Sequence, residues 1–269
     1  MIRRLAKVAG LLAVLAMPAF AQTTSLRSLD TRNDALAWQA VGRLDWQNGG
    51  YCTGTLIAPD LVLTAAHCVF DPKTGVAVSP KRMRFRAGVT EGSAVAERGV
   101  AQIVAHDGFT PGTPMSRDNV RHDIALVRLD SPVPTSLLAP FAVHRGAIEN
   151  GPVSVVSYGR GRSDALSRQN QCQVIEQVAR ILIMDCDVTF GSSGAPVFTH
   201  LNGRGRILSV VSGMGQYQGR KVAFGMELGP VLNELKSTMR ANAPRPKAIV
   251  RRLVVGAGKS STGAKFVKP

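Results

Sequence analysis

The sequence predicts an all-β protein made of antiparallel strands. Between about residues 56 and 212, short apolar runs alternate with turns that contain glycine or proline, and no long amphipathic helical pattern interrupts them. Short strands at this spacing are typical of antiparallel sandwiches and barrels, and the pattern alone does not separate the two. Residues 22–240 are ample for a sizeable core, as one compact unit or as two small barrels.

The predicted strands are residues 56–57, 61–63, 83–87, 99–105, 124–129, 153–157, 181–184, 195–198 and 207–212. The first two flank the turn at residues 58–60, and residues 83–87 alternate apolar and basic side chains as a strand with one exposed face does. Residues 131–140 contain three prolines and predict a linker between two halves.

One helix is predicted, at residues 230–240. Val231, Leu232 and Leu235 form an apolar stripe there, and Pro230 suits a first helical turn. Residues 241–246 then break the helix and begin a tail.

The first 21 residues resemble a secretory signal peptide. Arg3, Arg4 and Lys7 form a positive start, an apolar stretch follows at residues 8–17, and Ala19-Phe20-Ala21 is a small-x-small cleavage site. The alternative, a transmembrane anchor, is disfavoured because the apolar run is too short to span a bilayer. We therefore expect cleavage after Ala21 and a secreted or periplasmic protein.

Most of the positive charge is expected at the C-terminal end. Loss of residues 1–21 would reduce the formal charge of +15 to +12, and seven of these charges lie in residues 241–269, which contain no acid. We expect a solvated, flexible tail, with binding to an anionic envelope surface as the alternative. Phe266 is the only aromatic residue of this segment, so base stacking and specific nucleic-acid binding are not expected.

The four cysteines are Cys52, Cys68, Cys172 and Cys186. An exported chain favours disulfides, and the paired C-x-x-C spacing typical of zinc sites is absent. Four cysteines allow three pairings, and their spacing alone does not choose among them.

Three strings, in order along the chain, supply a histidine, an aspartate and a serine. They are residues 63–68 (LTAAHC), 123–126 (DIAL) and 191–196 (GSSGAP). A serine hydroxyl needs an imidazole to accept its proton, and the imidazole needs a carboxylate to fix its tautomer and stabilise its charged form. The strings and their order resemble the signature segments of the trypsin-like (chymotrypsin-fold) serine proteases.

The resemblance covers about residues 38–240 and implies two six-stranded antiparallel β-barrels, at about 38–135 and 141–228, followed by the helix. It implies a serine endopeptidase that acts on protein or peptide substrates through His67, Asp123 and Ser193, without a metal or other cofactor, and we expect a monomer. It also implies the disulfide Cys52–Cys68, which leaves Cys172–Cys186 as the second pair.

The nucleophile string departs from the family pattern Gly-Asp-Ser-Gly-Gly-Pro. Ser192 replaces the aspartate that, in zymogen-type members, pairs with the α-amino group released by activation, and the Arg-Ile-Val-Gly-Gly activation sequence is also absent. We therefore predict an oxyanion hole, made by the N–H groups of Gly191 and Ser193, that forms without activation, as in the bacterial glutamyl endopeptidase (V8-like) branch. Ser192 is the rival nucleophile, but the register of the motif selects Ser193.

Specificity is less determined by the sequence. Asp187 precedes Ser193 by six residues, the offset of the acid that binds arginine or lysine in trypsin-like members, but its surroundings do not match, and an ordinary surface aspartate is an equal alternative. Ser212 and Gly213 resemble the strand that lines the substrate backbone.

Two alternatives to this assignment are kept open. Asp118 and Asp107 are the fallback acids for Asp123. An inactive homologue that acts as a binding protein, or an anionic-surface binder that uses the tail, is the functional alternative.

Overall fold

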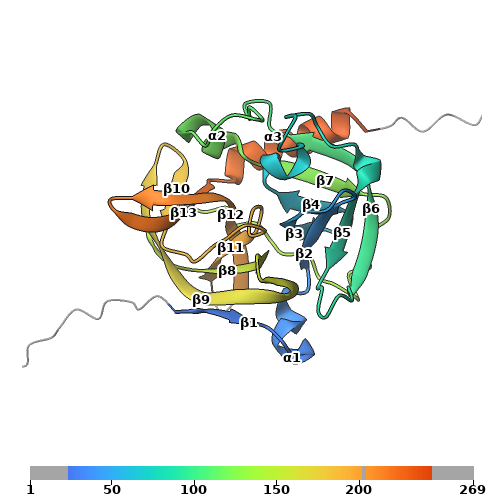
Figure 1. Ribbon diagram of the computed structural model, residues 1–269, viewed down its shortest axis with the longest axis horizontal. Helices are drawn as coiled ribbons and strands as arrows, with labels where there is room; N and C mark the ends of the chain where they lie inside the picture. Colours follow the sequence, from blue (N-terminus) through green and yellow to red (C-terminus); the bar gives the residue numbers. More distant parts are fainter. Residues whose placement is uncertain (1–23, 202–203, 244–269) are drawn as a thin grey trace, which may run out of the picture.

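The computed structural model describes residues 24–201 and 204–243, so the predicted signal peptide and nearly all of the basic tail lie outside the described residues. Two β-barrels make up most of the molecule and lie side by side in Figure 1. The helical elements are α1 (Arg32–Ala35), η1 (Leu36–Trp38), η2 (Ala66–Val69), η3 (Pro80–Arg82), α2 (Arg117–His122) and α3 (Gly229–Ala241).

The first barrel is closed by six antiparallel strands in the order β2-β3-β4-β7-β6-β5. Its strands are β2 (Val41–Trp46), β3 (Tyr51–Ala58), β4 (Leu61–Thr64), β5 (Met83–Ala87), β6 (Ala96–Ala105) and β7 (Ala125–Leu129). The four residues of β4 are all buried, which explains their continuous apolar character.

The second barrel also closes, because β8 pairs with both β9 and β11. Its strands are β8 (Gly151–Gly159), β9 (Arg162–Val178), β10 (Ile181–Met184), β11 (Pro196–Leu201), β12 (Arg204–Tyr217) and β13 (Arg220–Met226). The short β1 (Leu26–Ser28) adds to the outer side of β9. Two six-stranded antiparallel barrels and a C-terminal helix confirm the expected fold.

Among the described residues, three large apolar clusters and a smaller one around Ile181 and Val222 hold the fold together. One fills the first barrel around Leu44, Phe85 and Val127, and another fills the second around Leu182 and Val211. The third joins the barrels, since it unites residues of β4 and β7 with Tyr158 of β8, Phe198 of β11 and the apolar face of α3. A rigid apolar contact between the barrels can therefore position side chains that approach from both.

The helix α3 agrees closely with the predicted helix at residues 230–240. Its buried residues are Val231, Leu232, Leu235 and Met239, and Gln102 of β6 donates from Nε2 to the Met239 carbonyl at 3.1 Å. Within residues 24–201 and 204–243, no helix combines the length and the apolar character that a membrane span needs.

Both expected disulfides are present. Cys52 of β3 is bonded to Cys68 of η2, and Cys172 of β9 is bonded to Cys186, which follows β10. The first bond ties the histidine segment to the strand before it, and the second crosslinks a strand of the second barrel to the segment that leads to Ser193.

Candidate active site

His67 and Asp123 lie together on the first barrel. His67 lies in η2, directly after β4, and Asp123 ends α2 two residues before β7. Because β4 and β7 are paired, with Thr64 opposite Ala125, the two segments meet at one end of the barrel. Asp123 Oδ2 lies 2.7 Å from His67 Nδ1, and Asp123 Oδ1 accepts the His67 backbone N–H at 2.8 Å.

This geometry orients the imidazole. The Asp123 side chain is 4% exposed and the His67 side chain 35% exposed, so a buried carboxylate holds a ring whose far edge remains accessible. Ser212 of β12 donates its hydroxyl to Asp123 Oδ2 at 2.5 Å, which fills a third acceptor site from the second barrel. A carboxylate on Nδ1 places the proton there and leaves Nε2 free to accept another.

The fallback acids lie elsewhere. Asp118 is exposed and paired with Arg121 in α2, and Asp107 is exposed. The structure therefore brings only Asp123 of the three against His67.

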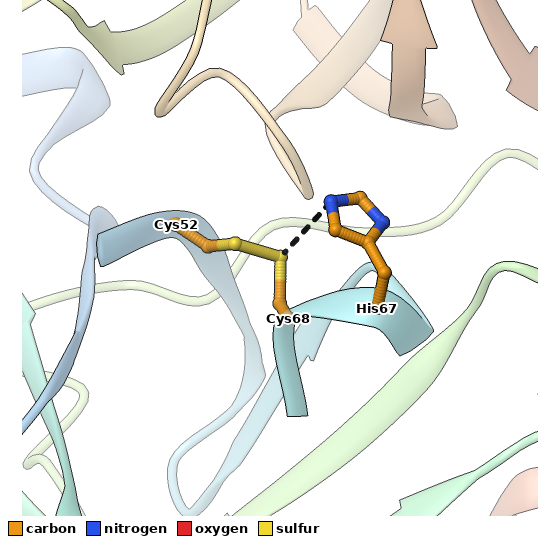
Figure 2. A group of neighbouring side chains, drawn as sticks. All are labelled: Cys52, His67 and Cys68. Atoms are coloured by element: carbon orange, nitrogen blue, oxygen red, sulfur yellow. Dashed lines mark hydrogen bonds between the residues drawn. A yellow bond between two sulfur atoms is a disulfide. The ribbon is translucent and has the colours of Figure 1, made fainter. Parts of the chain in front are cut away.

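The Cys52–Cys68 disulfide lies beside the imidazole of His67 (Figure 2). His67 Nε2 is 3.8 Å from Cys68 Sγ. Within the described part of the chain, these three residues form the only cluster of histidine, cysteine and acidic side chains close enough for one metal ion. Both sulfurs are held in the disulfide, and metal ligation needs thiolates, so the oxidised cluster is not a metal site.

Ser193 lies in the loop between β10 and β11. Its side chain is partly buried, its carbonyl accepts the Thr53 N–H of β3 at 2.8 Å, and its hydroxyl makes no hydrogen bond to any described residue. Hydrogen bonds between nucleophile and base are often long without substrate and tighten when it binds.

The peptide unit before Gly191 is fixed by its carbonyl. Phe190 C=O accepts the Arg160 N–H at 2.7 Å. Because C=O and N–H point in opposite directions in a trans peptide, this bond turns the Gly191 N–H away from Arg160. Gly191 has φ +94°, and a Cβ there would lie 2.5 Å from the Tyr51 ring, so only glycine fits.

The peptide unit before Ser193 is fixed in the same way. Ser192 C=O accepts the Ala195 N–H at 2.9 Å, which turns the Ser193 N–H away from Ala195. Gly194 also requires glycine: its φ is +75°, its N–H donates to Val211 C=O at 2.7 Å, and a Cβ would lie 2.2 Å from Thr64 Oγ1.

Within residues 191–195, two amides lack an acceptor. Among the described residues, the N–H groups of Gly191 and Ser193 donate to no oxygen, whereas the carbonyls of residues 190–193 all accept a bond. Gly191 and Ser193 are both partly buried, and two neighbouring free donors beside a serine can bind an oxygen that the protein itself does not supply.

The side chain of Ser192 points away from solvent. It is fully buried, and its hydroxyl contacts Ser157 Oγ at 3.2 Å, Tyr158 C=O at 3.3 Å and the Thr189 N–H at 3.3 Å. Arg162 adds a contact from its guanidinium at 3.4 Å. This engagement makes Ser192 unsuited to attack a substrate.

Arg162 and Thr53 are site residues that the sequence did not single out. Arg162 donates to Ser157 C=O at 3.2 Å, and burial lowers its pKa from the ordinary value, with Asp187 and Tyr51 opposing this effect. No sequence motif identifies Arg162. Thr53 directly follows Cys52, which is bonded to Cys68 next to His67, so its place in the sequence could have identified it.

Asp187 lies at the surface. Its side chain is 58% exposed and lies 3.3 Å from Lys221 Nζ of β13, while its backbone N–H donates to Gln169 Oε1 at 2.7 Å. Gly213 lies under Met115 of the first barrel, since a Cβ on Gly213 would be 3.1 Å from Met115 Cε.

A small pocket adjoins the imidazole. Its volume is about 170 Å³, and it is lined by His67, Phe109, Thr113, Met115, Asn119, Val120, Asp123 and Ser212. The pocket places the apolar side chains of Phe109, Met115 and Val120 next to His67.

Comparison with known proteins gives the family context. Residues 52–206 match the model of the trypsin-like peptidase domain. Collagenase from Hypoderma lineatum is 27% identical over 197 residues, which cover 65% of this chain and 71% of the relative. Serine protease SP24D from Anopheles gambiae is 30% identical over 135 residues, covering 46% of this chain and 44% of the relative. The chain thus spans less than half of the latter protein.

Two solved structures resemble the fold. A Glu endopeptidase in complex with MPD has a TM-score of 0.66 at 14% identity, covering 82% of this chain and 98% of that one. The thermostable serine protease AL20 from an extremophilic microorganism has a TM-score of 0.60 at 18% identity, covering 76% and 98%. At these identities the likeness concerns the fold.

Proposed function

Because the chain belongs to the trypsin-like peptidase family, we propose that it is a serine endopeptidase whose nucleophile is Ser193, whose general base is His67 and whose orienting acid is Asp123. The observation that carries this proposal is the pair of unpaired amides at Gly191 and Ser193. They lie in the loop that presents the only unbonded hydroxyl of the Ser192-Ser193 pair.

The reaction uses these groups in two steps. Ser193 Oγ forms a bond to the peptide carbonyl carbon as its proton passes to His67 Nε2, and the carbonyl oxygen becomes an oxyanion bound by the two amides. The C–N bond then breaks, and the proton moves from Nε2 to the leaving amine. Water repeats the sequence on the acyl-enzyme, giving up its proton through His67 and releasing the acid and free Ser193.

The amides contribute because they are already in place. One such donor can be worth about 3 kcal/mol to the transition state, since it costs no reorganisation when the oxyanion forms. The carbonyl bonds from Arg160 and Ala195 supply this preorganisation here.

We propose that the loop reaches this conformation without zymogen activation, as expected for the glutamyl endopeptidase branch. The contacts of Ser192 with Ser157 and Arg162 support this, because they occupy its hydroxyl without an α-amino group. N-terminal sequencing of active protein tests the proposal, and activity that appears only with a new terminus near Ala40 would contradict it.

The pairing of Asp187 with Lys221 supports the surface alternative for this aspartate. A carboxylate that already contacts a lysine of its own chain is less available to a substrate cation. A cleavage profile on a peptide library distinguishes the two, since dominant cleavage after arginine or lysine would restore Asp187 as the specificity acid. We keep Ser212 and Gly213 as backbone contacts for the substrate.

We further propose that the protein acts as a monomer outside the cytoplasm, secreted or periplasmic, on protein or peptide substrates. The two disulfides support an oxidising compartment. Residues 241–269 are proposed as a basic, solvated tail, with binding to an anionic envelope surface as the alternative, and salt-dependent retention of the chain with and without this tail distinguishes the two.

Labelling with a fluorophosphonate probe tests the catalytic proposal directly. The wild type should be labelled at Ser193, Ser193→Ala should not be labelled, and Ser192→Ala should retain a label on Ser193. A folded wild type that takes no label would favour the alternative of an inactive homologue acting as a binding protein. A label on Ser192 would overturn the assignment of the nucleophile.

A further inference from the structure

Thr53 of β3 lies at the point where the first barrel meets the loop of Ser193. It follows Cys52, so the histidine disulfide fixes its backbone, and it is completely buried. Its carbonyl accepts the Thr64 hydroxyl at 2.9 Å, which ties it to the strand that leads to His67.

Both donors of Thr53 bind carbonyls of the two residues proposed to supply the oxyanion-binding amides, Ser193 and Gly191. Its N–H donates to Ser193 C=O at 2.8 Å, and its hydroxyl donates to Gly191 C=O at 2.8 Å. The same hydroxyl accepts the Tyr158 N–H of β8 at 3.1 Å. The Thr53 side chain therefore connects the first barrel both to the loop that carries Ser193 and to β8 of the second barrel.

We propose that the Thr53 hydroxyl is a positioning group that fixes the oxyanion-binding amides, an inference that rests on the proposed protease function. Gly191 has a positive φ, and as a glycine its backbone has more rotational freedom than that of other residue types. Its C=O is held by Thr53, and the next N–H, on Ser192, is held by Thr189 C=O at 2.9 Å. These two bonds fix the peptide plane after Gly191, and the Arg160 bond fixes the plane before it.

Loss of the hydroxyl would free one of these planes. Valine has nearly the shape of threonine and suits a strand, but it can neither donate to Gly191 C=O nor accept from Tyr158 N–H. The Gly191 carbonyl would then be buried without its donor, and its peptide unit could rotate toward another partner. The two amides would keep the Arg160 and Ala195 bonds but would be held less firmly, because the peptide plane between them would lose one of its two bonds.

The same strand offers a matched control. Thr55 lies two residues along β3, is also completely buried, and its hydroxyl has no hydrogen-bond partner among the described residues. Thr55→Val therefore makes the same chemical change at the same burial without touching the loop.

The experiment compares hydrolysis of a peptide ester by the wild type, Thr53→Val, Thr53→Ser and Thr55→Val. We expect kcat to fall about 10- to 100-fold in Thr53→Val with little change in KM, which is less than the ~10²–10³-fold cost of removing a whole donor. A peptide boronic acid, which mimics the tetrahedral state, should lose affinity by a similar factor. Thr53→Ser should recover most of the activity, and Thr55→Val should resemble the wild type.

Each result separates the positioning role from general stability. Equal kcat in Thr53→Val and Thr55→Val would overturn the proposal, as would an effect on KM alone or a loss in Thr53→Ser as large as in Thr53→Val. If Thr53→Val does not fold, Thr53→Ala against Thr55→Ala repeats the comparison with less crowding of the Gly191 carbonyl. Failure of the wild type to react with a fluorophosphonate would instead refute the protease function itself.

Discussion

Tyr158 provides a direct test of how the barrels are joined. Its ring is completely buried between them, and its hydroxyl accepts the Val89 N–H of the first barrel at 2.6 Å and donates to Val89 C=O at 3.2 Å. Burial also raises the pKa of this phenol, which keeps it neutral and able to donate. Tyr158→Phe keeps the ring and removes both bonds.

The expected cost follows from the groups left behind. One buried N–H and one buried C=O of Val89 lose their partner, and each unsatisfied group costs about 1–3 kcal/mol, so we expect a loss of about 2–6 kcal/mol. For a chain of this size this corresponds to a fall in Tm of roughly 4–24 °C. Urea unfolding followed by tryptophan fluorescence measures it.

The control is Tyr51→Phe, which removes a phenolic oxygen that bonds to no described residue. It should change the free energy of unfolding by less than about 0.5 kcal/mol. A Tyr158→Phe protein as stable as Tyr51→Phe would refute the reasoning, because it would mean that the Val89 groups find other partners.

Three further predictions concern the site and its surroundings. Ser212→Ala removes one of three bonds to Asp123 and should lower kcat about tenfold with KM little changed, measured with a peptide ester. Arg162→Met should lower the fraction of protein that a fluorophosphonate titrates, whereas Arg162→Lys should retain more of it, because a cation remains at the nucleophile loop. Burial and the stacked His122 lower the pKa of His106, so the unfolded chain binds the extra proton, and the free energy of unfolding should fall as the pH drops below about 6.5. His106→Gln should flatten this slope, and an unchanged slope in urea titrations at pH 7.5 and 5.5 would contradict it.

The sequence predicted the strands that carry one clear apolar pattern and missed those that do not. Residues 83–87 and 181–184 coincide with β5 and β10. In contrast, β9 runs over 17 residues rich in polar side chains, such as RSDALSRQNQCQ, and was not predicted. Its pairing with β1, β8 and β10 stabilises it, and such long-range pairing leaves little trace in local composition.

The residues of the site also fall into two groups, those that a sequence motif identifies and those that no motif identifies. His67 and Asp123 are identified by strings, and the structure brings them together through the pairing of β4 with β7. Thr53 lies 138 residues from Gly191 along the chain, and Arg162 lies 30 residues from Ser192. The roles of Thr53 and Arg162 depend on these long-range contacts. No local sequence pattern encodes such contacts, and only the folded structure shows them.

The contacts of Ser192 give a physical reason why serine can stand where the family pattern has aspartate. In zymogen-type relatives an aspartate at this position needs a buried α-amino group, whose ordinary pKa is near 8, so that the pair weakens as the pH rises. Here two neutral hydroxyls, on Thr53 and Ser192, and the Arg162 guanidinium hold the loop. The hydroxyls do not titrate in the range where an α-amino group does, and a guanidinium starts from a far higher pKa. A buried ion pair also carries a large desolvation cost that hydroxyl contacts avoid. We therefore predict that the proposed oxyanion-binding amides, which would need no new terminus, are also insensitive to alkaline pH.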